Sequence, residues 1–415
     1  MKIVHINYFD NKGGAGKAAF RLHESLKKSG CESKILVDYK FSNSEDVRSV
    51  DERGGWRRNA LRLINLGESF TGLQYLCPRP NGFLSDPFLS DARVIHLHNI
   101  HGGFFSLSAL SQLTERYPVV WTLHDMWGLT GHCGYAYDCN RWETGCGSCP
   151  YLNEYPPLKV DRTSFLWKQK EKIYRRSRLT LVSPSQWLRD LIKKSPLLRN
   201  FEVRVIPYGV DLKVFRPVDR EEARKELNLP KEAFIILFGA AFAAEERKGK
   251  SFITEVLSRL SQNISEKIFF AEFGSAFEDL NTSTGIPKKI FGVVQDEKKL
   301  AMLYSAADVF ICPSLADNLP NTVLESLACG TPVVGFNVGG IPETIQHLKT
   351  GYLARYRDVH DLVSGIQYFV REKDHVLMTR AHCRQFAEAQ YSLEHEVKEH
   401  LSLYLEVINQ RNAHE

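Results

Sequence analysis

Two carboxylates, Asp317 and Glu325, are separated by seven residues in the most informative stretch of the chain, AADVFICPSLADNLPNTVLESLACGTPVVGFNVGGIPE. The apolar run that ends at CPS predicts a strand, and a helix is expected to begin near Asn321. The amides of the intervening turn and the N-terminus of the helix attract phosphate, whereas carboxylates accept hydrogen bonds from sugar hydroxyls. Together these groups predict a nucleotide-sugar site. The alternative is that Asp317 caps the helix and Glu325 is a surface charge.

A glycine-rich segment, NKGGAGKAAF, follows the first predicted strand and contains Gly13, Gly14 and Lys17. Glycines and a lysine at this spacing are typical of the phosphate loop of an ATPase. The next residue is Ala18, however, where such a loop needs a Ser or Thr hydroxyl as a ligand of Mg²⁺. The segment is therefore a damaged ATP site, a phosphate loop of another kind or a tight turn.

Alternating strands and helices predict an α/β fold. Residues 2–8 and 34–39 read as buried strands joined by the glycine loop and a helix over 17–30 that ends on Gly30, which is a βαβ unit of a parallel sheet. Ligands of such sheets bind beyond the carboxyl ends of the strands, where two further predicted strands place side chains that should cluster. These are His98, Asn99, His124 and Asp125. The pattern restarts near Phe215, so two doubly wound domains with a cleft between them are expected.

The stretch from Asp317 to Glu343 resembles the signature of family 4 of the retaining glycosyltransferases. The match is closest over Leu327–Val334 and Gly339–Glu343, and it extends to VSPSQW, VIPYGVDLKVFRP, RKG and LYSAADVFICPS. LHNIHGGFF and TLHDMWGLTGHC are most similar to enzymes of exopolysaccharide and colanic-acid-type assembly. The resemblance implies the GT-B fold, in which two Rossmann-like domains face each other across a cleft. The expected parts are an acceptor-side domain over residues 1–212, a nucleotide-sugar donor domain over 213–385, and a helical segment over 386–415 that returns to the first domain.

The resemblance also implies roles on the sugar donor. Glu325 would hold the ribose, and Asp317 would face the donor sugar, although the family has the longer Glu at this position. Lys248 would neutralise the diphosphate, and Val294 stands where the family's backbone contacts the base. The amides expected at the phosphates are those of Asn318, Leu319 and Asn321, because Pro320 has no N–H.

At one other position the chain departs from the residue that the family often has, and further positions match the family. The family often has an arginine after the glycine that ends a strand of the second domain, where this chain has Ala240, so Arg247 is the candidate substitute. His124 matches the histidine between acceptor and donor sugar. Gly13 and Gly14 match the glycine pair that approaches the donor diphosphate, which favours a non-ATPase phosphate loop. The catalytic residues implied are His124, Asp317 and Lys248. Surface charges at Arg247 and Lys248 and a buried structural histidine at position 124 are the alternatives.

Four cysteines gather in HCGYAYDCNRWETGCGSC, and two of them have the C-x-x-C spacing of metal ligands. A structural zinc and unmetallated thiols are both open. The four residues are Cys133, Cys139, Cys146 and Cys149.

Composition indicates a water-soluble globular chain, with 43% hydrophobic and 25% charged residues and a net charge of +5. Residues 159–204 hold thirteen basic and four acidic residues, which favours either peripheral contact with an anionic membrane or a solvated helix face. No nucleic-acid-binding module, signal peptide or spanning segment is recognised, so a cytoplasmic protein at the inner face of the membrane is expected.

The function expected from these features is transfer of a hexose from a nucleoside-diphosphate sugar to a hydroxyl of a saccharide, with retention and with a lipid-linked intermediate as acceptor. Amides and cations would stabilise the leaving diphosphate, and no cofactor or catalytic metal is expected because no Asp-x-Asp motif is recognised. The alternatives are a sugar-nucleotide epimerase or hydrolase of the same fold, a non-catalytic saccharide-binding member, and an ATPase, against which Ala18 argues.

Overall fold

The chain forms two α/β units. The computed structural model describes residues 1–50, 56–76, 83–240, 246–263, 266–274, 284–372 and 376–413. The first unit comprises Met1–Pro207 and the segment from Glu396 onward, and the second comprises Tyr208–His395. The expected boundaries lay at 212/213 and 385/386. Residues 386–395 belong to the second unit, in which the helix that contains the first half of them packs against another helix.

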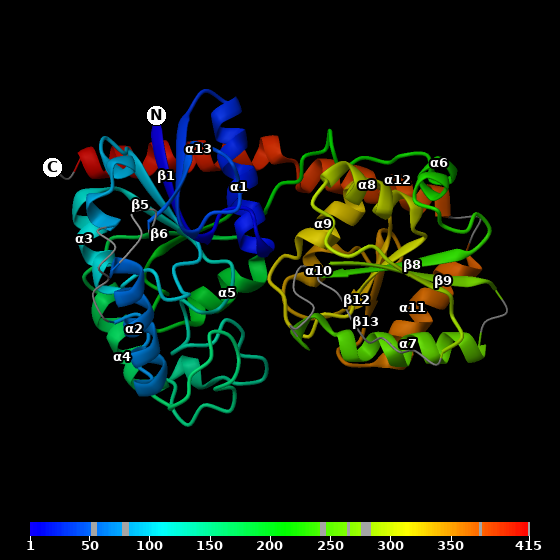
Figure 1. Cartoon of the computed structure of the whole chain (residues 1–415), viewed down its shortest axis with the longest axis horizontal. Helices are drawn as coiled ribbons and strands as arrows, with labels where there is room; N and C mark the ends of the chain where they lie inside the picture. The colour runs from blue at the N-terminus through cyan, green and yellow to red at the C-terminus, as the bar shows by residue number, and fades with distance from the viewer. Residues whose placement is uncertain are drawn as a thin grey trace. The chain divides into compact units, whose positions relative to one another are not determined.

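The first unit is built on a seven-stranded sheet in which every paired strand is parallel (Figure 1). Its buried strands are nearly continuous apolar runs, as expected when helices cover both faces. In sheet order the strands are β3 (Val47–Ser49), β2 (Glu32–Tyr39), β1 (Lys2–Phe9), β4 (Val94–Leu97), β5 (Val119–Thr122), β6 (Thr180–Ser183) and β7 (Glu202–Val205).

Among the described residues, six α-helices belong wholly or mainly to this unit. The C-terminal helix packs against the sheet: Val397, Leu403 and Tyr404 share a buried apolar cluster with Ile3 of β1 and Leu22. The expected return of this helix to the first domain is confirmed. The helices are α1 (Gly13–Lys28), α2 (Trp56–Thr71), α3 (Ser108–Arg116), α4 (Thr163–Tyr174), α5 (Gln186–Lys194) and α13 (Leu393–Asn412).

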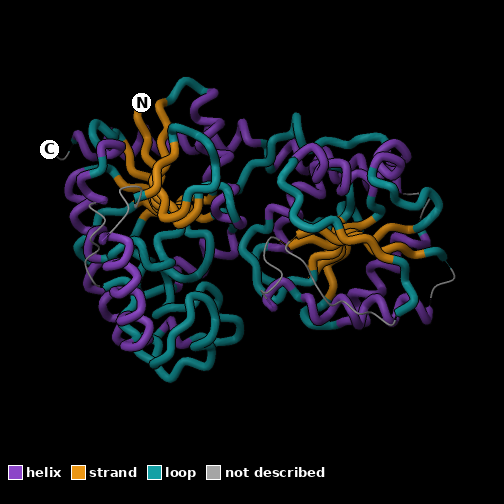
Figure 2. Tube along the Cα trace, viewed as in Figure 1, coloured by secondary structure: helices purple, strands orange, loops and turns teal. Residues whose placement is uncertain are grey.

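The second unit repeats the plan with a six-stranded parallel sheet, and Figure 2 shows the strands of each unit gathered between helices. In sheet order the strands are β10 (Lys288–Ile290), β9 (Ile268–Gly274), β8 (Phe234–Ala240), β11 (Val309–Cys312), β12 (Val333–Phe336) and β13 (Gly351–Ala354). The helices are α6 (Arg220–Glu226), α7 (Lys250–Asn263), α8 (Glu297–Ala306), α9 (Asn321–Ala328), α10 (Ile341–Thr344), α11 (Val359–Arg371) and α12 (Val376–Gln390).

Most expected strands and helices are confirmed, with three differences. Strands β3 and β13 were not predicted, because the first has three residues and the second is half-exposed at the edge of its sheet. The apolar run over residues 289–294 is a strand only as far as Ile290, where β10 ends. Helix α1 begins at Gly13 and not at Lys17, so the glycines form its first turn. Its predicted end is confirmed, since Ser29 is the C-cap and Gly30 follows with φ +82°.

Candidate active site

Asp317 lies just beyond β11, at the carboxyl end where open α/β sheets bind ligands. Its side chain is buried, and Lys248 donates a hydrogen bond from Nζ to Oδ2 over 2.6 Å. The guanidinium of Arg247 lies 3.5 Å from the same oxygen, and Ser314 donates to it over 3.3 Å. The structure therefore brings together three of the residues singled out in the sequence. Asp317 does not cap the helix, since the N-cap position of α9 belongs to Pro320.

Backbone contacts hold the two cations beside the carboxylate. Arg247 donates from Nη1 to the carbonyl of Ala316 over 2.8 Å, and the N–H of Leu315 donates to the carbonyl of Arg247 over 2.7 Å. Gly249 has φ +77°, and a Cβ there would lie 1.8 Å from the carbonyl oxygen of Pro313. Only glycine fits at this close approach, which brings the Arg247–Lys248 segment against the end of β11.

The charge balance of this group is net positive by one unit. Burial opposes ionisation of Asp317, but the charges of Lys248 and Arg247 and the hydrogen bonds from Lys248 and Ser314 outweigh burial and lower its pKa. Asp317 is thus an anion at neutral pH, facing two cations. The surface-charge interpretations of Lys248 and Arg247 are not supported, because their side chains are only 23% and 17% exposed and both approach Asp317.

The turn before α9 presents backbone toward the end of the sheet. Asn318 and Leu319 are buried, and Asn321 is the first residue of the helix. The N-cap residue, Pro320, makes no side-chain hydrogen bond to the first turn. The peptide dipoles of a helix place a partial positive charge at its N-terminus, so this end of α9 can stabilise an anion.

Glu325 lies in the second turn of α9 and is 2% exposed, so it is not a surface charge. The hydroxyl of Tyr304 in α8 donates to Oε2 over 3.0 Å. A buried carboxylate oriented by a buried phenol is built to accept further hydrogen bonds. The sequence pattern found Glu325 but not Tyr304, whose side chain reaches it from the neighbouring helix.

Two other positions of the second unit are placed without direct contact to this group. Val294 follows β10 and is half-buried. Ala240 ends β8, and the five residues after it lie outside the described residues. The chain has Ala240 where the family often has arginine. A guanidinium is instead supplied near Asp317 by Arg247.

In the first unit, Gly13 and Gly14 open α1 directly after β1. Gly13 has φ +71°, a backbone conformation that glycine adopts without strain. Ala18 is buried within α1. The helix N-terminus here has no side-chain cap and no acidic residue in its first turn, which suits an anion.

The polar residues after β4 and β5 do cluster, as predicted. His98 Nδ1 and His124 Nε2 are 3.0 Å apart, and His101 Nε2 is 3.1 Å from Asp125 Oδ2. Burial lowers the pKa of His124 to about 3, so the imidazole is neutral. The backbone N–H of Asn99 donates to Asn7 Oδ1 over 3.0 Å.

The cysteine segment is an irregular loop held by the rest of the unit. Gly131 donates its N–H to Cys146 Sγ over 3.2 Å, and His132 Nε2 is 3.4 Å from Cys149 Sγ. Burial raises the pKa of Cys133 to about 12 and of Cys146 to about 11. Within the described part of the chain, only His5, His96 and His98 bring three ligand atoms within 4.8 Å of one another. Structural zinc and unmetallated thiols both stay open at Cys133, Cys139, Cys146 and Cys149.

Lys170 was not singled out by the sequence as an individual residue. It is 1% exposed, and its ammonium donates to the carbonyls of Trp127 over 2.5 Å and Thr130 over 3.0 Å. Its Nζ also lies 3.6 Å from the centre of the Trp127 ring. Lys170 thus fixes the segment that follows His124 and Asp125. Its place within a basic stretch gave no sign of burial.

Two family models match the chain. The model described as Glycosyltransferase Family 4 matches residues 12–214, and that described as Glycosyl transferases group 1 matches residues 219–390. The chain belongs to the glycosyltransferases that combine these two domains. The resemblance found in the sequence is confirmed.

The chain is also similar to individual glycosyltransferases. It is 27% identical over 370 residues to the Escherichia coli K12 protein WcaC, described as a colanic acid biosynthesis glycosyl transferase, with 83% of this chain and 85% of that protein covered. It is 31% identical over 232 residues to the sulfoquinovosyl transferase SQD2 of Arabidopsis thaliana, covering 52% of this chain and 44% of that protein.

Solved structures of low sequence identity share the fold. Sucrose-phosphate synthase from Thermosynechococcus elongatus superposes with a TM-score of 0.71 at 19% identity, covering 98% of this chain and 99% of that one. Anabaena HepE in complex with UDP-glucose superposes with a TM-score of 0.63 at 14% identity, covering 99% and 100%. The fold is GT-B, and the predicted fold class is confirmed. None of the helices in the described segments is long and apolar enough to cross a bilayer.

Proposed function

We propose that this glycosyltransferase moves a hexose from a nucleoside-diphosphate sugar to a hydroxyl of a saccharide, with retention of configuration at the anomeric carbon. The observation that carries the proposal is the group formed by Lys248, Arg247 and Asp317 at the end of β11, next to the start of α9. Cations and helix amides suit a diphosphate, and the buried carboxylate of Glu325 suits ribose hydroxyls. HepE, which shares the fold, was solved with UDP-glucose.

The leaving diphosphate gains negative charge in the transition state. Lys248 and Arg247 would stabilise that charge, and because they are already held in place, little reorganisation is needed during the reaction. In this proposal no divalent ion is required, and transfer survives dialysis against EDTA. Loss of transfer on dialysis, restored by Mg²⁺, would contradict this part of the proposal.

For retention we propose a route without a covalent intermediate on Asp317. Oδ2 of this carboxylate accepts hydrogen bonds from Lys248 and Ser314, which weakens it as a nucleophile. We therefore assign the proton of the acceptor hydroxyl to an oxygen of the departing phosphate, with attack on the face that the diphosphate leaves. Asp317 then orients the sugar and balances the cations.

The acceptor proposed is a lipid-linked saccharide intermediate of an exopolysaccharide. Its support is the similarity to WcaC, described as a colanic acid biosynthesis enzyme. The base of the donor, the sugar and the linkage are determined by pocket shape, and single residues do not identify them.

The test is a transfer assay with UDP-, GDP- and ADP-sugars and a panel of lipid-linked saccharides, with the product's anomeric proton followed by NMR. The proposal predicts acceptor-dependent release of one nucleoside diphosphate and a product with the donor's anomeric configuration. Turnover without acceptor would identify an epimerase or hydrolase. Binding of saccharide with no turnover would identify a non-catalytic member.

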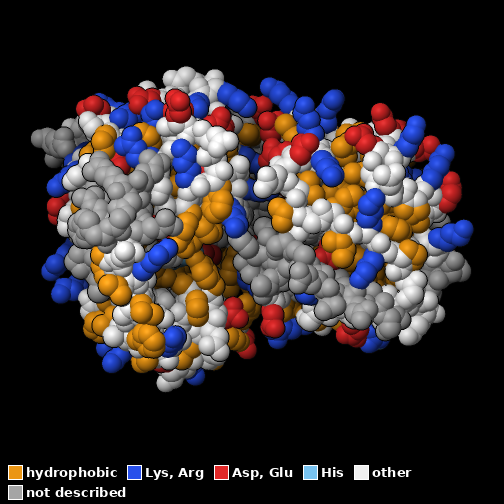
Figure 3. Space-filling view, viewed as in Figure 1, with side chains coloured by type: hydrophobic (Ala, Val, Ile, Leu, Met, Phe, Trp, Pro, Cys, Tyr) orange, Lys and Arg blue, Asp and Glu red, His pale blue; other side chains and the backbone are white. Residues whose placement is uncertain are grey.

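Peripheral contact with an anionic membrane is proposed for the first unit. Exposed apolar side chains stand beside exposed bases of the stretch 159–204: Leu63, Leu66, Phe70, Tyr155, Val160 and Phe165 are apolar, and Lys159, Arg162 and Lys168 are basic. Figure 3 shows hydrophobic side chains gathered over α2 and the neighbouring surface. Lys159 Nζ lies 4.1 Å from the centre of the Phe70 ring, so the two kinds of residue are intermixed.

The membrane proposal is tested with phosphatidylglycerol vesicles. Binding should fall steeply with salt, because each base near the surface contributes about 1 kcal/mol. Neutral phosphatidylcholine vesicles are the control and should bind far less. Equal binding to both kinds of vesicle, or binding to neither, would indicate that the basic stretch is a solvated surface and not a membrane contact.

A structural zinc at the four clustered cysteines is tested by metal analysis of the purified chain. About one zinc per chain, with loss of stability on chelation, would establish it. Four freely titratable thiols in a chain without metal would exclude the structural zinc.

A further inference from the structure

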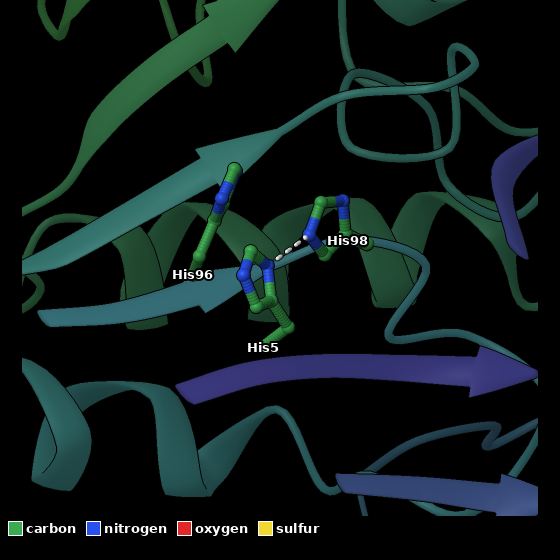
Figure 4. Close-up of side chains that lie close together, drawn as sticks. All are labelled: His5, His96 and His98. Carbon is green, nitrogen blue, oxygen red and sulfur yellow. Dashed lines mark hydrogen bonds between the residues drawn. The ribbon is translucent and has the colours of Figure 1, made fainter. Parts of the chain in front are cut away.

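Three buried imidazoles form a hydrogen-bonded chain that ends at His124. His5 Nδ1 lies 3.0 Å from His98 Nε2, and His98 Nδ1 lies 3.0 Å from His124 Nε2. Figure 4 shows the rings of His5 and His98 joined in this way, with His96 beside them. The rings also stack pairwise, with centroids 5.3 Å and 5.2 Å apart.

The parallel register of the sheet produces this arrangement. His5 of β1 is paired with His96 of β4, so their side chains point to the same face, and His98 follows two residues later on that face. The preceding pair on the same face, Ile3 and Val94, belongs to the apolar cluster under α13. The polar side chains at the carboxyl end of the sheet thus continue one row further into the sheet, as far as His5.

All three rings are neutral at physiological pH. Burial is the main cause that lowers the pKa of His5, His98 and His124, and neighbouring histidines lower those of His5 and His98 further. A neutral imidazole has one N–H and one lone pair. Each ring can therefore donate once and accept once, so the chain has only two states, with all protons on Nδ1 or all on Nε2.

The inner end of the chain favours one of these states. His5 Nε2 is buried and has no hydrogen-bond partner among the described residues. With all protons on Nε2, an N–H would be left there without an acceptor, whereas with all protons on Nδ1 only a lone pair is left. Buried donors without an acceptor are rarer in proteins than acceptors short of a donor.

We propose that His5 and His98 hold His124 in the tautomer that carries its proton on Nδ1. The lone pair of Nε2 then accepts from His98, so His124 has no lone pair with which to act as a general base. This inference rests on the proposed function and on the role in transfer that the family resemblance implies for His124, and it makes His124 a hydrogen-bond donor in that role. His98 is a positioning residue that acts through His124.

A metal site is the competing interpretation of the same cluster, since ligand atoms of His5, His96 and His98 lie within 4.8 Å of one another. Both nitrogens of His96 are already engaged: Nδ1 lies 2.7 Å from the hydroxyl of Tyr404 and Nε2 lies 2.7 Å from that of Thr122. A metal held by all three rings would have to break one of these contacts of His96 and one of the two hydrogen bonds of His98.

The test is a long-range ¹H–¹⁵N correlation spectrum of the full chain labelled with ¹⁵N-histidine, which distinguishes protonated from unprotonated ring nitrogens. The signals of His124 are assigned from their loss in His124→Asn. The wild type should show Nδ1–H on His5, His98 and His124. His98→Phe removes the donor to Nε2, so His124 should shift to the Nε2–H form or to a mixture, with kcat falling on the order of ten-fold and the donor KM little changed.

His96→Phe is the matched control, because it removes an equally buried imidazole two residues away on the same face that is not part of the chain. It should lower the melting temperature and leave Nδ1–H on His124. An Nε2–H on His124 in the wild type, no change in His98→Phe, or about one metal per chain lost in His96→Phe would each overturn the inference. If the tautomers are as expected but no sugar nucleotide supports transfer, the proposed function fails and the tautomer assignment stands.

Discussion

The ammonium of Lys248 lies 2.6 Å from Oδ2 of Asp317, in an ion pair that joins residues 69 positions apart in the chain. The pair is only partly exposed, so solvent screens it less than an exposed pair. Asp317 lies beside two cations at this end of the sheet, Lys248 and Arg247, and the three groups together carry a net charge of +1. Removal of Lys248 is therefore expected to weaken nucleotide binding, whereas removal of the Asp317 charge is expected to leave binding as tight or tighter.

Lys248→Met should reduce kcat for transfer by on the order of 10²–10³, because it removes a charge that stabilises the departing diphosphate. Steady-state kinetics with the preferred donor measure the effect. Lys267→Met, at an exposed lysine of the same unit, is the control and should transfer normally. A Lys248→Met variant that is folded and fully active would show that this lysine does not contact the leaving group.

Asp317→Asn should lower transfer while nucleoside diphosphate binds at least as tightly as to the wild type. The substitution keeps the shape of the side chain and removes the anion that balances Lys248 and Arg247, so both cations become more available to phosphate. Calorimetry with the bare nucleotide separates the two effects. Weaker nucleotide binding with unchanged transfer would reverse the roles given to this residue.

Glu325→Gln should raise the donor KM about ten-fold or more and change kcat less, because ribose hydroxyls are held alike in the ground and transition states. Tyr304→Phe removes only the hydroxyl that donates to Oε2, at a cost of about 1 kcal/mol, and should raise KM by a smaller factor. Should both variants lower kcat and leave KM unchanged, Glu325 does not bind the nucleoside.

The buried ammonium of Lys170 should make the free energy of unfolding depend on pH. Burial lowers its pKa to about 7, against 10.5 in an exposed lysine. Between these values the unfolded chain binds more protons than the folded chain, so stability rises with pH by up to about 1.4 kcal/mol per unit and is constant below about pH 7. Urea unfolding of the wild type and Lys170→Met from pH 6 to about 10 should show this slope in their difference.

The control for that measurement is Lys172→Met, at an exposed lysine of the same helix. Its difference from the wild type should not vary with pH. A flat difference for Lys170→Met as well would mean that Lys170 stays charged in the folded chain.

The sequence predicted the two domains, because strands buried on both faces leave long apolar runs, and it singled out most residues of the candidate site, because Asp317 and Glu325 belong to one local pattern. It could not predict the partners of these residues. Tyr304 reaches Glu325 from α8, and the contact of Lys248 with Asp317 depends on how two loops meet. His5 was not singled out in the sequence, since its contact with His98 is set by the register between β1 and β4.

The charge of a stretch also did not predict burial. Lys170 was counted with the basic residues 159–204, yet its ammonium is bound by two carbonyls inside the unit. Burial of a lysine depends on tertiary packing, and nothing in the local sequence distinguishes Lys170 from Lys172. The start of α1 was misplaced because glycines are typical of loops, whereas here they form a helical turn close to the end of β1.

In the proposed function, the second unit binds the nucleoside diphosphate of a sugar donor through Lys248 and Glu325. Calorimetric titration of UDP, GDP and ADP into the wild-type chain and into the double variant Lys248→Met/Glu325→Gln tests it most directly. We expect one nucleotide to bind the wild type with a Kd below about 1 mM and to bind the double variant at least about 100-fold more weakly, a loss of about 2.7 kcal/mol. Equal affinity of the wild type and a folded double variant for that nucleotide, or no binding of any nucleotide to the wild type, would contradict the claim.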